Sequence, residues 1–178
     1  MRLDMNVPVV AVTLFAAAVA QDLIPVTPHV PVKLVFLTAA ALYFAMTKPL
    51  LAGLTALVWA GALTDALGGQ VLTCTLTFLL LMFGAVRLAQ RVFLEPTLLQ
   101  GTLLLAVVAP MQILWTRFWM ETGVFFSMDT LRVLAASVPA GLAAGFAGFA
   151  VCGLADRLSG NIKPVKEDNG ILWAETNR

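Results

Sequence analysis

The chain has 178 residues, of which 60% are hydrophobic and 12% are charged, and its mean hydropathy is +0.92. Soluble domains usually carry about 25% charged residues, so this composition excludes an ordinary water-soluble domain. The formal net charge is only +1, and the basic residues stand singly or in pairs. This pattern argues against a protein that binds nucleic acid.

The apolar residues are gathered into six runs, each close to the roughly 20 residues that a helix needs to cross a bilayer. The sequence therefore predicts an all-α membrane bundle within residues 1–154. Its spans are expected at about 7–24, 31–47, 50–67, 71–86, 98–116 and 131–154, and a polar cytoplasmic tail is expected at 155–178. Turn residues such as Pro25, Pro49 and the pair Gly68-Gly69 separate the first four spans.

The distribution of Lys and Arg predicts the orientation, because positive charge is retained on the cytoplasmic side. A cytoplasmic N-terminus places most basic residues inside: Arg2, Lys48, Arg87, Arg91, Arg157, Lys163, Lys166 and Arg178. It leaves Lys33, Arg117 and Arg132 outside. Both ends are therefore expected in the cytoplasm of a multi-pass membrane protein.

The first span has a second interpretation. Arg2, the apolar stretch and Ala18-Val19-Ala20 before Gln21 are also typical of a cleaved secretory signal. The span continues through Leu23 and Ile24, which favours a retained helix.

Small residues recur at helical spacing in the third and sixth spans. In the third span they are Gly53, Ala56, Ala60 and Gly61, and in the sixth they are Gly141, Gly145 and Gly148. Small side chains allow two membrane helices to approach closely. These residues are therefore candidates for helix packing, either inside the bundle or against a partner protein.

Asp65 follows Gly61 by four residues and lies near the end of the third span. A carboxylate there is disfavoured by the helix dipole and needs a polar environment. One interpretation is a hydrated residue, or one that caps backbone amides around Gly68 and Gly69. The others are a buried anchor for a neighbouring helix or loop, and a proton relay.

Motifs of enzyme chemistry are scarce in the chain. His29 is the only histidine, and Cys74 and Cys152 lie in apolar runs without metal-binding spacing. No nucleotide-binding or hydrolase motif is present. We therefore expect no catalytic residue, no metal and no cofactor, and we expect a protein that is not an enzyme.

The stretch Gly61-Ala-Leu-Thr-Asp65-Ala-Leu-Gly68-Gly69-Gln-Val71-Leu72 resembles the rod shape-determining protein MreD family. That family shows a Gly, an Asp four residues later, a Gly-rich turn and then Pro-Leu-Gly, whereas here Val71 and Thr73 stand in place of the Pro and the Gly. The resemblance implies a scaffold in the bacterial inner membrane that acts with MreC, MreB, RodA and a class B penicillin-binding protein. It would help to set cell shape by positioning peptidoglycan synthesis.

MreD-like proteins are similar in fold to the substrate-binding (S) subunits of energy-coupling-factor vitamin transporters, which gives a competing hypothesis. Those subunits dock through an Ala-x-x-x-Ala face on their first helix. Ala16 and Ala20 match part of this pattern, and Val12 departs from it.

Overall fold

The computed structural model describes residues 6–24, 34–68, 74–90, 97–120 and 128–158. Its helices are α1 (Asn6–Leu23), α2 (Phe36–Thr47), α3 (Leu50–Gly68), α4 (Cys74–Gln90), α5 (Leu98–Met120) and α6 (Met128–Leu158). The described ranges contain no strand, so the predicted all-α fold is confirmed. Gly69, His29 and residues 159–178 lie outside the described part of the chain.

Among the described residues, three helices are long and apolar enough to cross a membrane: Leu50–Gly68, Leu98–Trp119 and Met128–Leu158. The other three are apolar but shorter. Among them α2 has 12 residues, about 18 Å of helix against a hydrocarbon core of about 30 Å. The run expected to span at 31–47 is thus helical only from Phe36 within the described residues.

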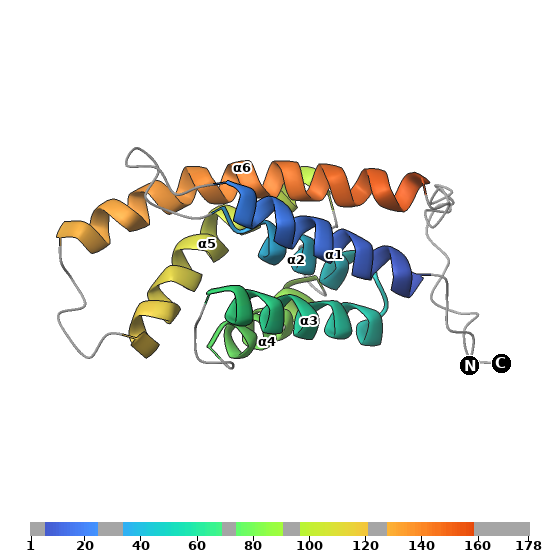
Figure 1. Ribbon diagram of the computed structural model, residues 1–178, viewed down its shortest axis with the longest axis horizontal. Helices are drawn as coiled ribbons and strands as arrows, with labels where there is room; N and C mark the ends of the chain where they lie inside the picture. The colour runs from blue at the N-terminus through green and yellow to red at the C-terminus, as the bar shows by residue number, and fades with distance from the viewer. Residues whose placement is uncertain (1–5, 25–33, 69–73, 91–96, 121–127, 159–178) are drawn as a thin grey trace.

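The short α2 is the centre of the bundle. All its residues from Leu37 to Met46 are buried, and it contacts each of the other five helices. In Figure 1, α6 runs along one side of the molecule and α3 and α4 lie on the opposite side, with α1 and α2 between them. A helix that is apolar on every face is expected in such a central position.

The most extensive helix pair is α5 with α6. They pack closely around Leu105 and Gly141. Beyond Pro110, the second half of α5 runs away from α6 toward α4 (Figure 1). A proline inside a helix removes one backbone hydrogen bond and permits bending.

Successive helices run in opposite directions, so the bundle has two ends (Figure 1). We call the end where α1, α3 and α5 finish the Asp65 end, and the end where α2, α4 and α6 finish the Asp156 end. Helix α6 ends at Leu158, whereas the sequence predicts that the sixth span ends at 154. Residues 155–158 are therefore helical, and Asp156 lies in the bundle rather than in a tail.

Candidate functional site

The small residues of α3 are covered by the chain's own helices. Gly53, Ala56, Ala60 and Gly61 are all buried. A Cβ atom at Gly53 would lie 3.1 Å from the Cα of Ala45 in α2, and one at Gly61 would lie 2.8 Å from the Cα of Leu76 in α4. These glycines let α3 approach two neighbours at backbone distance.

The small face of α6 is covered in the same way. A Cβ at Gly141 would lie 2.5 Å from the carbonyl oxygen of Leu105, and one at Gly145 would lie 3.0 Å from the Cα of Thr102, both in α5. A Cβ at Gly148 would lie 2.6 Å from the Cβ of Ala39 in α2. The alternative that the two small faces receive a helix from another protein therefore does not fit this structure.

Asp65 is fully buried and joins the end of α3 to the beginning of α4. The Thr75 N–H donates to its Oδ1 at 2.9 Å, and the Leu76 N–H donates to its Oδ2 at 3.3 Å. The first N–H groups of a helix lack partners within that helix, and an aspartate beside them also meets the positive end of the helix dipole. Asp65 is thus a buried anchor that caps α4. Gly68, by contrast, is the exposed last residue of α3.

A second buried carboxylate, that of Asp156, lies at the opposite end of the bundle. Lys48 Nζ lies 2.8 Å from its Oδ1, and the two side chains are only 9% and 3% exposed. The Tyr43 hydroxyl donates to its Oδ2 at 3.1 Å, and the Tyr43 ring packs edge-on against Phe149. This cluster fixes the end of α6 to the end of α2.

The end of α4 joins the same region through two side-chain donors. Arg87 Nη2 donates to the Lys48 carbonyl oxygen at 2.7 Å, and Gln90 Nε2 donates to the Met46 carbonyl oxygen at 3.0 Å. The Arg87 guanidinium also lies 5.3 Å from the centre of the Phe83 ring. The last carbonyl groups of a helix have no partner within it, so α4 supplies partners for the end of α2.

The sequence interpretation missed the Asp156 cluster. Hydropathy falls after Leu154, so the predicted sixth span ends two residues too early to include the aspartate. A signal was nevertheless present, because Lys48 and Asp156 were both expected on the cytoplasmic side and their charges are opposite. Such a pair of charges at the ends of apolar helices is a candidate ion pair.

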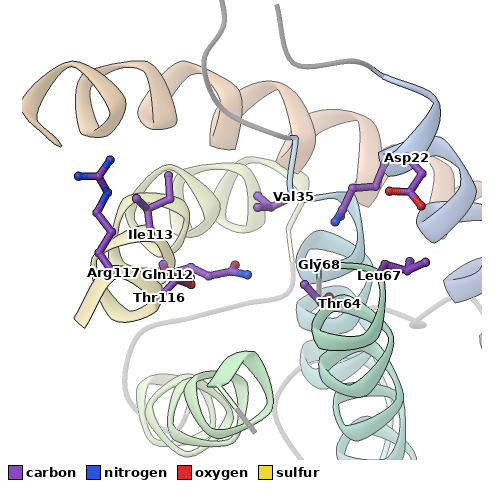
Figure 2. A pocket seen from close by; sticks show the side chains of 10 residues that line it. Asp22, Val35, Thr64, Leu67, Gly68, Gln112, Ile113, Thr116 and Arg117 are labelled. Carbon is purple, nitrogen blue, oxygen red and sulfur yellow. Dashed lines mark hydrogen bonds between the residues drawn. The ribbon is translucent and has the colours of Figure 1, made fainter. Parts of the chain in front are cut away.

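The Asp65 end contains a hollow of about 290 Å³ between α1, α3 and α5, over the start of α2. Figure 2 shows it with Asp22 and Arg117 on opposite sides and the Gln112 amide between them. Arg117 also donates to the Thr130 hydroxyl at 2.5 Å, which links α5 to α6 at this end. The lining combines leucine, isoleucine and valine side chains with amides, hydroxyls and one charge of each sign.

The described residues contain no group of three or more His, Cys, Asp or Glu side chains that could hold a metal ion. The two buried carboxylates are each engaged in structural contacts, Asp65 with backbone N–H groups and Asp156 with Lys48 and Tyr43. Their arrangement can fix helices relative to one another. Among the described residues, the hollow is the feature best suited to receive another molecule.

Comparisons with protein-family models, with curated proteins and with solved structures found no match to this chain.

Proposed function

We propose that this chain is a non-enzymatic scaffold or adaptor of the bacterial cell-wall elongation complex. The proposal is carried by the structural part that Gly61 and Asp65 play. Both belong to the stretch that resembles the MreD family, and both hold the start of α4 against the end of α3. The Gly and the Asp, four residues apart, thus act together: the Gly lets α4 approach α3 closely, and the Asp caps the start of α4.

The proposed location is the bacterial inner membrane, with several spans and both termini in the cytoplasm. In this orientation the Asp156 end is cytoplasmic and carries Lys48, Arg87 and Arg157. The Asp65 end faces outward and carries Arg117 and Arg132. The charge rule that supports this orientation concerns short loops and residues near the ends of spans.

The proposed partners are MreC, MreB, RodA and a class B penicillin-binding protein. Because the small faces of α3 and α6 are covered, these partners have to contact other surfaces. The exposed aromatic residues Phe118 and Trp119, at the outer end of α5, are suited to this role because aromatic residues are enriched at protein interfaces.

Depletion of the protein from its own bacterium tests the scaffold proposal. We expect rod-shaped cells to become round and lateral wall synthesis to lose its pattern, with recovery on re-expression of the wild-type chain. Cells that keep their shape and their synthesis pattern after depletion would contradict the proposal.

Affinity purification in mild detergent then tests the contact surface. We expect Trp119→Ala to reduce co-purification of the partners about tenfold, a typical effect for loss of an interface anchor. Leu103→Ala serves as the control, because Leu103 is equally exposed but lies in the first half of α5, 16 residues before Trp119. Equal recovery of partners with both variants would place the interface elsewhere.

A second candidate function is the vitamin-capturing subunit of an energy-coupling-factor transporter. The hollow at the Asp65 end favours it, since such a subunit needs convergent polar groups in a pocket near the outer face. Ala16 is exposed on α1, where the docking face of these subunits lies. Under this alternative the purified protein binds a vitamin tightly and co-purifies with an ATPase module.

A further inference from the structure

Two buried glutamines face the hollow at the Asp65 end, and both are held by the first turn of α2. The Leu37 N–H donates to Gln21 Oε1 at 3.2 Å. The Thr38 hydroxyl donates to Gln112 Oε1 at 2.9 Å. Gln21 is 8% exposed and Gln112 is 7% exposed, so both residues are more than nine-tenths buried.

The Leu37 contact determines which way the Gln21 amide is turned, and in Gln112 the amide oxygen faces the Thr38 hydroxyl. A backbone N–H can only donate, so the Gln21 atom that it meets is the oxygen, and the amide nitrogen points the other way. Neither glutamine nitrogen has a hydrogen-bond partner within the described residues. Both residues line the hollow, and Figure 2 shows the Gln112 amide extending from α5 toward Thr64 and Gly68 of α3.

The hydroxyl groups of the lining add no further donors. The Thr64 hydroxyl donates to the Ala60 carbonyl oxygen at 2.7 Å, and the Thr116 hydroxyl donates to the Gln112 carbonyl oxygen at 2.9 Å. Apart from the Arg117 guanidinium, which donates to the Thr130 hydroxyl, the side-chain donors of the lining without a partner among the described residues are therefore the two amide nitrogens. Neither nitrogen is among the buried atoms that lack a partner, so both are open to the hollow, and a molecule that supplies acceptors there gains hydrogen bonds to them.

From this geometry we propose that the hollow binds a small, largely apolar molecule through a carbonyl or carboxylate oxygen. The oxygen accepts from the amide nitrogens of Gln21 and Gln112, at the positive end of the α2 dipole. The apolar part lies against Leu67 and Ile113. A volume of about 290 Å³ is at the lower end of the range for ligand sites and leaves room for a substituted benzene ring.

This inference does not depend on the scaffold proposal, because it concerns what the hollow accepts. The same acceptor chemistry has two sources, a free solute and the ester carbonyl of a membrane lipid. Both are covered by one experiment on the full chain in lipid nanodiscs.

Equilibrium dialysis with radiolabelled benzoate, benzamide and benzylammonium tests the proposal, because these probes share one ring and differ in the polar group. We expect benzoate and benzamide to bind above the level of protein-free nanodiscs, and benzylammonium to stay at that level. Binding of all three probes, or of none in either nanodisc type described below, would overturn the proposal.

The sharpest variants are Gln112→Glu and Gln21→Glu. Each keeps an oxygen to accept from α2 and replaces the free amide nitrogen with a second oxygen. We expect either variant to weaken binding of benzoate and benzamide about tenfold or more. Thermal unfolding measured alongside shows that the fold is kept. Wild-type affinity in both variants would overturn the assignment.

Gln100→Glu is the matched control. Gln100 lies 12 positions before Gln112 on α5, about 18 Å away. Its N–H donates to the Thr97 hydroxyl oxygen at 3.3 Å, at a helix start where a glutamate is favoured. Because its Oε1 is buried without a hydrogen-bond partner, thermal unfolding is measured for this variant too. We expect wild-type binding of benzoate and benzamide, and a loss as large as that of Gln112→Glu would count against a local site.

Nanodiscs of ester lipids and of ether lipids separate the two sources, because ether lipids lack acyl carbonyls. If a lipid ester is the resident ligand, it competes with the probes in the ester-lipid discs and is missing from the ether-lipid discs. The probes then bind more tightly in the ether-lipid discs. Equal binding in both identifies a free solute. Each of these results supports the hydrogen-bond acceptor chemistry.

Discussion

The two ends of the bundle each bury an aspartate, and they satisfy it by different means. Asp65 accepts two backbone N–H groups that lie 10 and 11 residues further along the chain. Asp156 is paired with side chains of Lys48 and Tyr43, more than 100 residues away. The first contact joins the two helices of one hairpin, α3 and α4. The second joins α6 to α2, which are far apart in the sequence.

This difference predicts unequal consequences when each carboxylate loses its partners. A capped helix start can fray locally and leave the rest of the bundle in place. A buried ion pair that loses one partner leaves an uncompensated charge, which is strongly destabilising. The Asp156 end should therefore be the more sensitive of the two.

The largest effect is expected from Lys48→Met. Removing the ammonium group leaves the buried Asp156 with the Tyr43 hydroxyl as its one side-chain partner among the described residues, and we expect the free energy of unfolding to fall by about 3–5 kcal/mol. Titration with sodium dodecyl sulfate in mixed micelles measures it. The double variant Lys48→Met with Asp156→Leu should recover most of the loss, because an apolar pair then replaces the ion pair.

The control for this prediction is Arg132→Met. Arg132 and Asp129 form an ion pair at 3.9 Å whose side chains are 82% and 83% exposed. Exposed pairs contribute little because solvent screens them, so we expect almost no change. If Lys48→Met were as mild as Arg132→Met, the Asp156 cluster would not hold the bundle together.

A smaller effect is expected from Gly61→Ala at the other end. The added Cβ would lie 2.8 Å from the Cα of Leu76, which belongs to backbone and cannot turn aside. Separating α3 from α4 should cost about 1–3 kcal/mol of unfolding free energy. The same titration measures this loss.

Gly84→Ala on α4 is the matched control, because nothing lies within 4 Å of a Cβ placed at Gly84. Alanine has the higher helix propensity, so we expect a slight gain in stability or none. Similar losses in Gly61→Ala and Gly84→Ala would mean that α3 and α4 do not meet at backbone distance.

Periodicity and turn residues predicted the all-α fold and the approximate position of each helix, because these depend on neighbours in sequence. The spacing of Gly53 and Gly61, and of Gly141, Gly145 and Gly148, also indicated close helix packing. The sequence could not show which helix covers each face. That depends on the order of packing in space, which places the 12-residue α2 at the centre.

The roles of the polar residues were harder to predict, because each depends on a partner far along the chain. Asp65 was recognised as unusual, and its partners Thr75 and Leu76 are close enough in sequence for a capping role to have been among the interpretations. Gln112 was not singled out, because an isolated glutamine in an apolar run has no local signature. Its role depends on the hydrogen bond with Thr38, which lies 74 residues earlier in the sequence.

The smallest effect is expected from Asp65→Asn. This substitution distinguishes capping from other roles of the carboxylate. Asparagine keeps one acceptor oxygen but places an amide nitrogen where the second oxygen accepted, so one of the Thr75 and Leu76 N–H groups loses its partner. We expect a loss of about 1 kcal/mol in unfolding free energy. Faster amide hydrogen exchange should be confined to the first turn of α4. If exchange instead rose equally in the last turns of α2 and α6, Asp65 would act on the whole bundle, and the contrast between the two ends would be lost.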